Sequence, residues 1–67
     1  MNTGKVKFFK DDKGFGFIVD DKSGSDVFVH ISKLNNKLGL RKDESVQYEL
    51  IQGKKGQEAS NVSVIGG

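Results

Sequence analysis

The chain has 67 residues, which leaves room for one domain, and a chain this short hides only about 60 % of the surface that its unfolded form exposes. We therefore expect a single domain over residues 1–67 with modest stability. The sequence has no cysteine and one histidine, which excludes disulfides, a thiolate metal site and ordinary zinc ligation. Its net charge of +2, from eleven basic and nine acidic residues, is a weak argument for a polyanionic partner.

No apolar run approaches the roughly 20 residues of a membrane span, and residues 1–5 lack the apolar stretch of a secretory signal. The lack of cysteine is compatible with a reducing compartment. We therefore expect a soluble, cytoplasmic protein with no membrane partner.

Residues 5–10 are predicted to form the first strand, with Val6 inward, the lysines outward and Phe8 as a second inward candidate. The adjacent pair Phe8-Phe9 breaks the alternation. The two rings share a face only if a bulge intervenes, and otherwise one ring is at least partly exposed. A strand this rich in lysine suits phosphates, but it is equally typical of a solvated edge strand that lysines protect against aggregation.

A turn at residues 11–14 leads to a second strand over residues 15–20, and the stretch Lys13-Gly14-Phe15-Gly16-Phe17-Ile18 joins the two. In a strand both phenylalanines project from one face, and the glycines keep the other side thin. Ile18 is in phase with the glycines, so it cannot share a core with the two rings. Either the rings are the core, or Ile18 is buried and the rings form a surface that can receive unpaired bases.

The third strand, residues 26–31, bears on this choice. If its branched residues are buried, as β-propensity favours, Phe28 and His30 face outward, and the neighbouring strand buries Ile18 and exposes its two phenylalanines. Four flat rings then share one face, which is typical of a binding surface. The alternation assigns one side to Val27, Val29 and Ile31 and the other to Asp26, Phe28 and His30.

Residues 32–44 are the least regular segment. We predict a loop with at most one helical turn, capped by Ser32, with Leu34, Leu38 and Leu40 as apolar anchors. The segment lacks the long apolar period of an ordinary helix.

Two further strands are predicted at residues 45–52 and 58–65, joined by the basic turn at residues 53–56. Five short strands with turn signals between them indicate an all-β fold, a small closed barrel. The inward residues predicted in these last two strands are Val46, Tyr48, Leu50, Ser60, Val62 and Val64.

Four segments resemble motifs of the bacterial cold-shock protein family, in order and at nearly its spacings: Gly4-Lys5-Val6-Lys7, Lys13-Gly14-Phe15-Gly16-Phe17-Ile18, Asp26-Val27-Phe28-Val29-His30 and Ala59-Ser60-Asn61-Val62. The two central segments look like its RNP1 and RNP2 elements. RNA-recognition-motif domains carry a similar Lys-Gly-Phe-Gly-Phe string, but they need two helices that this chain does not provide. The resemblance implies a five-stranded antiparallel OB-type barrel that binds single-stranded RNA or DNA and acts as an RNA chaperone.

The resemblance also implies a site. Base stacking falls to the aromatic rings, and contacts to phosphates or base edges fall to lysines. No cofactor, metal or small-molecule substrate is expected, and the protein is expected to be a monomer. The residues assigned to nucleic-acid binding are Lys7, Phe8, Lys13, Phe15, Phe17, Phe28, His30 and, as a basic loop residue, Lys55.

The chain departs from the family pattern at several positions. Most members have tryptophan in place of Phe8 and an aromatic residue in place of Ile31, so the stacking surface looks reduced here. The loop after His30 looks about two residues shorter, and only Leu38 or Leu40 can stand in for its usual aromatic residue. These changes bear on affinity and base preference rather than on the fold.

We do not expect an enzyme, because His30 is the one candidate for proton transfer and no nucleophile with its base is specified. Gly14 and Gly16 are not followed by a Walker lysine or a dinucleotide fingerprint. The main alternative is a protein-interaction module whose aromatic face holds an apolar peptide. A peptide groove does not require adjacent lysines, whereas nucleic acid does.

Overall fold

The computed structural model describes residues 1–35, 39–53 and 56–65, and within them the chain forms five strands and one short 3-10 turn. The strands close into a barrel in the order β1-β2-β3-β5-β4. The expected all-β, five-stranded barrel is therefore confirmed. The elements are β1 (Asn2–Lys10), β2 (Phe15–Asp20), β3 (Asp26–His30), η1 (Ile31–Lys33), β4 (Ser45–Gly53) and β5 (Gly56–Val64).

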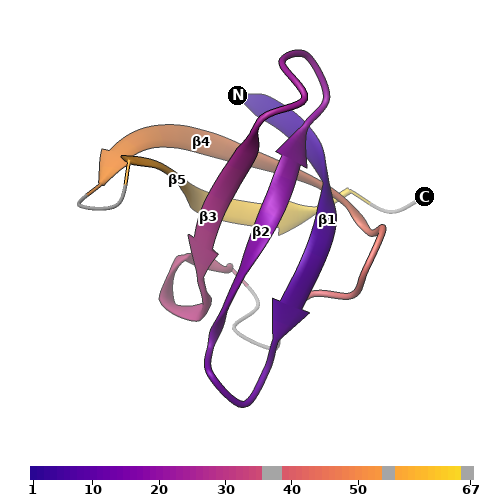
Figure 1. The fold of residues 1–67 in the computed structure, drawn as a ribbon, viewed down its shortest axis with the longest axis vertical. Helices are drawn as coiled ribbons and strands as arrows, with labels where there is room; N and C mark the ends of the chain where they lie inside the picture. The colour runs from indigo at the N-terminus through magenta and orange to yellow at the C-terminus, as the bar shows by residue number, and fades with distance from the viewer. Residues whose placement is uncertain (36–38, 54–55, 66–67) are drawn as a thin grey trace.

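The barrel has two layers. Strands β1, β2 and β3 lie side by side as antiparallel neighbours, and β4 and β5 cross behind them (Figure 1). Strand β4 pairs with the first half of β1, and β3 meets β5 in parallel through Phe28 and Glu58. The pairing with β4 explains why β1 begins at Asn2, three residues before the predicted start.

The core fills the space between the layers. Ile18 is fully buried, at 0 % exposure, so the rings of β2 face away from the core and the first of the two alternatives for this strand is wrong. Val27 and Val29 of β3 are buried beside it, as predicted. The buried apolar residues are Val6, Ile18, Val27, Val29, Leu34, Leu40, Val46, Tyr48, Ala59 and Val62, with Phe9 and Ile31 packed against them.

A bulge in β1 resolves the Phe8-Phe9 pair. Val6 pairs with Ile18 and Phe8 with Phe17, so Lys7 is the extra residue between them. The bulge reverses the alternation, which turns Phe8 outward beside Phe17 and packs Phe9 against the core. Of the two rings, Phe9 is therefore the inward one, and Phe8, the second inward candidate of the alternation pattern, faces outward.

Gly16 makes room for this arrangement. It pairs with Phe9 across the two strands, and a Cβ at Gly16 would collide with the carbonyl oxygen of Phe8 and lie 2.7 Å from the Phe9 ring. Only glycine lets β1 and β2 approach this closely. The Phe9 ring therefore lies on the side of β2 where Gly16 has no side chain.

A second bulge changes the predicted phase of β5. Gln47 pairs with Ser63 but Glu49 pairs with Ser60, so β5 has one extra residue here, and Asn61 has a positive φ of 53°. Ala59 and Val62 are buried as a result. The inward predictions for Ser60, which is half-buried, and for Val64, which is 38 % exposed, are wrong.

Two smaller predictions also need correction. Leu50 shares a register position with buried Ala59 but is itself 39 % exposed. The 3-10 turn η1 is capped by His30 rather than by Ser32, because the imidazole accepts the Ser32 backbone N–H. Leu34 is buried as expected, whereas Leu38 lies outside the described residues.

Among the described residues, one carboxylate is buried, that of Asp20 at the end of β2. Its Oδ2 accepts hydrogen bonds from the Tyr48 hydroxyl and from Asn2 Nδ2 (3.1 Å), and its Oδ1 accepts from the backbone N–H groups of Lys22 (2.8 Å) and Ser23 (3.1 Å). The bond from Tyr48 is the largest of the causes that hold the pKa of Asp20 well below its usual range. Burial, and then the carboxylate, raise the pKa of Tyr48 above its usual range.

Candidate nucleic-acid interface

The outer face of the β1–β3 layer carries a cluster of aromatic side chains, which we call the aromatic face: Phe8, Phe15, Phe17, Phe28 and His30. Strand register brings them together. Phe17 pairs with Phe8 on one side and with Phe28 on the other, and Phe15 pairs with His30. Paired residues project on the same side of a sheet, so three strands contribute to one surface.

The phenylalanine rings contact one another. The ring centroids of Phe8 and Phe17 lie 5.5 Å apart at an interplanar angle of 55°, and those of Phe17 and Phe28 lie 5.7 Å apart, edge to face at 76°. The Phe15 and Phe28 rings are stacked at 25° with centroids 6.0 Å apart. These are the offset and edge-to-face arrangements that aromatic quadrupoles favour, so the rings hold each other in place.

Each of the four phenylalanines is half-buried, while the branched residues that alternate with them in β2 and β3 are buried. Half-burial leaves part of each ring open to solvent. A cluster of large apolar side chains on the outside of a small barrel is typical of a binding surface.

His30 lies at the end of β3 and is exposed. Its Nδ1 accepts the backbone N–H of Ser32 at 3.1 Å and lies 2.9 Å from the Ser32 hydroxyl oxygen. The ring is therefore held by hydrogen bonds to its own turn, whereas the phenylalanines are held by ring contacts.

Lys7 lies beside the aromatic face at the bulge of β1. Its Nζ forms an ion pair with Asp26 Oδ2 at 3.0 Å, with the lysine side chain 51 % and the aspartate side chain 47 % exposed. An ion pair this exposed contributes about 0 to 1 kcal/mol, so a phosphate can compete for the lysine.

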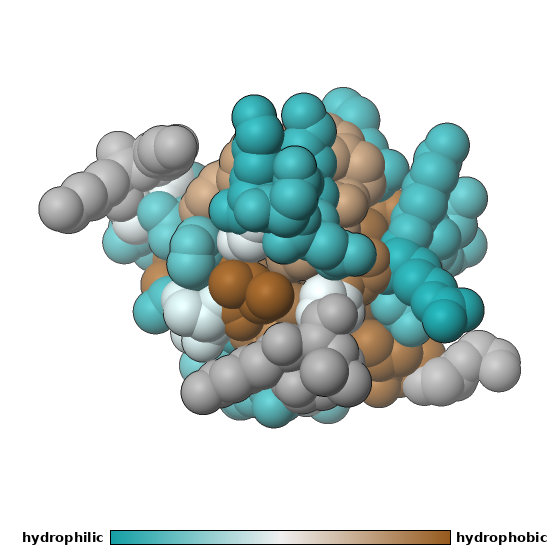
Figure 2. Space-filling view, turned by 90° about the horizontal axis from the view of Figure 1, so that it is seen from below, coloured by the Kyte–Doolittle hydropathy of each residue, from teal (hydrophilic) through white to brown (hydrophobic). Residues whose placement is uncertain are grey.

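Lys13 is exposed in the β1–β2 turn, which is closed by hydrogen bonds from the backbone N–H groups of Lys13 and Gly14 to the carbonyl of Lys10. Gly14 has a positive φ of 74°, and its carbonyl accepts the N–H of Ile31, which joins this turn to η1. Seen from this end of the barrel, hydrophilic residues dominate, with apolar residues visible between them (Figure 2). Lys55 lies outside the described residues.

Two contacts at this surface were missed in the sequence. Alternation places Asp26 on the outer side of its strand, but its ion pair with Lys7 also depends on strand order and on the bulge. The sequence pattern predicts Ser32 as a helix cap, although a serine two residues after a histidine is within reach of the Nδ1 atom. The spacing alone could have suggested this second contact.

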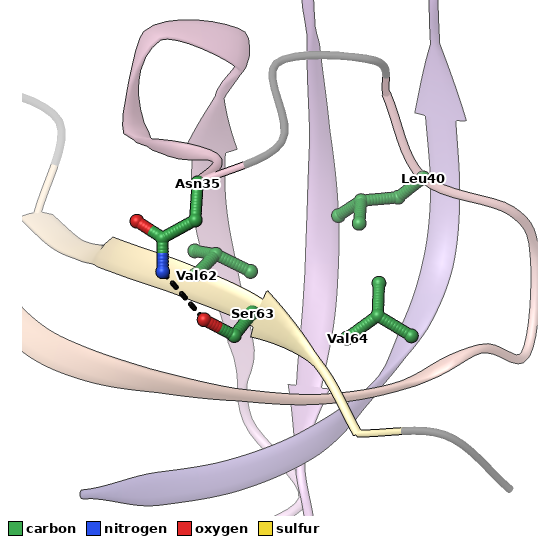
Figure 3. Close-up of a pocket in the computed structure, with 5 residues that line it drawn as sticks. All are labelled: Asn35, Leu40, Val62, Ser63 and Val64. Atoms are coloured by element: carbon green, nitrogen blue, oxygen red, sulfur yellow. Dashed lines mark hydrogen bonds between the residues drawn. The ribbon is translucent and has the colours of Figure 1, made fainter.

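A hollow of about 250 Å³ lies away from this surface, between the end of η1 and β5. It is lined by Asn35, Leu40, Val62, Ser63 and Val64, and the Asn35 amide donates a hydrogen bond to the Ser63 hydroxyl (Figure 3). Within the described ranges there is no group of three or more His, Cys, Asp or Glu residues that could hold a metal ion. Likewise, none of the described residues forms a helix long and apolar enough to span a membrane.

Comparison with known proteins decides the family. A protein-family sequence model described as the 'Cold-shock' DNA-binding domain matches residues 2–65. The chain belongs to the cold-shock domain family. The resemblance seen in its four sequence motifs is thereby confirmed.

Curated relatives carry cold shock protein names, and their matches to this chain cover most of both sequences. The cold shock-like protein CspA of Shewanella violacea is 48 % identical over 63 residues, which cover 91 % of this chain and 90 % of the relative. The cold shock protein ScoF of Streptomyces coelicolor is 42 % identical over 65 residues, covering 94 % and 97 %. The cold shock protein CspB of Geobacillus stearothermophilus is 42 % identical over 64 residues, covering 92 % and 96 %.

Members of the cold-shock domain family are nucleic-acid-binding proteins. In this chain the aromatic face, with a lysine at its edge and another in the adjacent turn, is the surface whose chemistry suits such a ligand. Rings provide stacking area for bases, and ammonium groups provide attraction for phosphates.

Proposed function

We propose that this protein binds single-stranded RNA and DNA through its aromatic face and acts as an RNA chaperone that keeps transcripts unpaired. Bases stack on Phe8, Phe15, Phe17, Phe28 and His30, while lysines attract the phosphates. The protein acts as a monomer in the cytoplasm and uses no cofactor.

One observation carries the proposal: aromatic rings from three strands lie half-buried on one outer face while the alternating Ile18, Val27 and Val29 fill the core. Each stacked base contributes roughly 1 to 3 kcal/mol, and stacking tolerates any base because every base has a π-face. Three or four rings can therefore supply useful affinity with little dependence on sequence.

The same observation favours single strands. Bases in a duplex are stacked on each other and expose only their edges, so a flat ring on a barrel surface cannot reach their faces. Stacking also does not involve the 2′-hydroxyl, and we therefore expect RNA and DNA to bind comparably.

Chaperone activity follows from this selectivity by mass action. A protein that binds only the open form of a hairpin stabilises that form by an amount set by its free concentration relative to its Kd. A marginal hairpin is opened in this way without ATP, and a stable one is left closed.

The test is a fluorescence titration with a labelled single strand of about ten nucleotides, the corresponding RNA and the blunt duplex of the same sequence, at one fixed salt concentration. We expect both single strands to bind and the duplex to bind at least about tenfold more weakly, since its bases offer no free faces. Equal affinity for duplex and single strand would refute the proposal.

The chaperone step needs its own measurement. A hairpin labelled with a fluorophore and quencher, and marginally stable at the assay temperature, should open as protein is added, whereas a hairpin with a longer stem should stay closed. If oligonucleotides do not bind at all and an apolar peptide does, the peptide-binding alternative is correct.

A further inference from the structure

We propose that Ser32 is a positioning residue for nucleic-acid binding: it holds the His30 imidazole in one orientation and one tautomer, with the Nε2–H group available to the bound strand. This inference rests on the proposed function. It concerns a residue outside the set assigned to binding.

The contacts fix one end of the ring. His30 is the N-cap of η1, with extended backbone angles, and its Nδ1 accepts the backbone N–H of Ser32 at 3.1 Å. The Ser32 hydroxyl oxygen lies 2.9 Å from the same nitrogen. Two polar groups of one residue, the N–H and the hydroxyl of Ser32, therefore lie within hydrogen-bond distance of Nδ1.

The backbone donor determines the tautomer. An N–H group can only donate, so Nδ1 must be the unprotonated nitrogen, and the hydroxyl, which can rotate, turns its hydrogen toward the same lone pair, which the two donors share. A proton on Nδ1 would face the Ser32 N–H directly. In the neutral ring the proton is consequently on Nε2, the nitrogen that Ser32 does not engage.

The anchor also restricts rotation. The χ2 torsion of a histidine is broad and roughly two-fold, so an unanchored ring exchanges the positions of its nitrogen and carbon edges. Fixing Nδ1 selects one of the two arrangements. Because His30 is exposed, it lacks the packing that restrains a buried ring.

This restraint matters for binding. The phenylalanine rings of the aromatic face contact one another at centroid distances of 5.5 to 6.0 Å, which orders them. The contacts with Ser32 order the His30 ring at the end of that face in a similar way. A ring that is already oriented loses less conformational freedom when a base stacks on it. It also presents an N–H donor at its rim, which suits a base carbonyl or a phosphate oxygen.

The first measurement is made on the free protein. Long-range ¹H–¹⁵N spectra, recorded in alkaline buffer once they show a neutral imidazole, should show His30 with a protonated Nε2 and an unprotonated Nδ1. The Ser32→Ala variant keeps the backbone donor but loses the hydroxyl. Its ring nitrogen shifts should therefore move part of the way toward a mixture of tautomers.

The second measurement is affinity for the labelled single strand. Ser32→Ala should bind about threefold more weakly, as expected for one exposed hydrogen bond, and Ser32→Thr, which keeps a hydroxyl, should restore both affinity and the ring shifts. Ser23→Ala is the matched control, because the Ser23 hydroxyl also makes a hydrogen bond two residues away in the chain, as acceptor from the backbone N–H of Ser25 at 3.2 Å, but in the β2–β3 turn. It should bind like the unmodified protein.

Two results would overturn the inference. One is a free protein whose neutral His30 carries its proton on Nδ1 or shows an even tautomer mixture. The other is a Ser32→Ala variant with unchanged ring shifts and the affinity of Ser23→Ala. If no variant binds single strands, the proposed function fails, but the ring spectra still decide whether Ser32 positions His30.

Discussion

The aromatic face and the Asp20–Tyr48 cluster both combine rings with charged groups, but they handle the charge in opposite ways. The Asp20 carboxylate is buried and accepts hydrogen bonds from four donors, one of them the Tyr48 hydroxyl. At the aromatic face the phenylalanine rings are half-buried, and Lys7 forms an exposed ion pair with Asp26. The difference separates a cluster that stabilises the barrel from one that can receive a ligand.

Magnitudes support this division. Hydrogen bonds to a charged group contribute about 1.5 to 3 kcal/mol each when they are sheltered from water. An exposed ion pair contributes about 0 to 1 kcal/mol. Breaking the first cluster should therefore affect folding, and altering the second should affect binding with little change in stability.

The largest effect is expected from Asp20→Ala. This change leaves the buried Tyr48 hydroxyl and the Asn2 amide without their acceptor, which should lower the free energy of unfolding by roughly 2 to 4 kcal/mol. Urea unfolding measures the loss. Asp21→Ala is the matched control, because Asp21 is the exposed neighbour in the sequence, and it should be nearly neutral. Equal stabilities of the two variants would show that the cluster does not stabilise the barrel.

The Asp20–Tyr48 cluster also predicts that the protein loses stability at acid pH. Because the pKa of Asp20 is lowered in the folded state, chiefly by the Tyr48 hydroxyl, its contribution is present above the unfolded pKa of about 4 and is lost as the pH falls below it. The free energy of unfolding should therefore decrease as the pH falls from about 5 toward about 2, a range that spans the unfolded pKa and extends below it. Tyr48→Phe should show a shallower decrease, and a decrease as steep as that of the unmodified protein would contradict the assignment.

Next in size is the effect of Phe17→Ala on binding. Phe17 contacts both Phe8 and Phe28, so its loss removes one stacking ring and loosens two others. Affinity for single strands should fall by on the order of 1 to 3 kcal/mol. Leu50→Ala, which removes a 39 % exposed side chain from β4, is the control and should bind normally. If Phe17→Ala unfolds early but binds normally when folded, the rings serve the core instead.

Much of this arrangement could be predicted from alternation alone. The pattern of β3 placed its valines inside, and pairing with β2 then required Ile18 inside and its phenylalanines outside. Such reasoning works because side chains in a strand alternate strictly between faces. It needs only two neighbouring strands in register.

The errors at Phe8, Ser60 and Val64 occur where alternation is interrupted. The bulges at Lys7 and Asn61 each add one residue, which moved Phe8 outward and made Ala59 and Val62 the buried pair of β5. A bulge depends on how two strands meet, and the sequence of one strand does not specify it. The contact between Lys7 and Asp26 was missed for the same reason.

The salt dependence of binding distinguishes the two lysines of the site. If about three phosphates are neutralised, log K should fall against log salt with a slope near −2. Lys13→Ala should flatten this slope by about 0.7, the value for one phosphate of a single strand. Lys7→Ala should flatten it less, because Asp26 already compensates Lys7 in the free protein.

Lys22→Ala, in the turn at the other end of β2 and β3, is the control for these two variants and should leave the slope unchanged. Binding that does not depend on salt would instead favour an apolar peptide as the ligand. Equal changes for Lys7→Ala and Lys13→Ala would mean that Asp26 does not compensate Lys7 in the free protein.

The smallest effect is expected from Phe8→Trp. Phe8 is half-buried on the aromatic face, and an indole offers a base more stacking area and a stronger quadrupole than a phenyl ring does. Affinity for single strands should increase by about a few tenths to 1 kcal/mol. Stability should change little, because an outward position accepts added volume without a cavity.

The variant carries its own reporter, since the chain has no other tryptophan. The indole of Phe8→Trp should fluoresce as a solvent-exposed group and be quenched when an oligonucleotide is added. Phe9→Trp is the matched control: its side chain packs against the core and Gly16, so the larger ring should destabilise the barrel and its emission should be shifted to the blue. If the two variants exchange these properties, the bulge at Lys7 is absent in solution, and the aromatic face then includes Phe9 in place of Phe8.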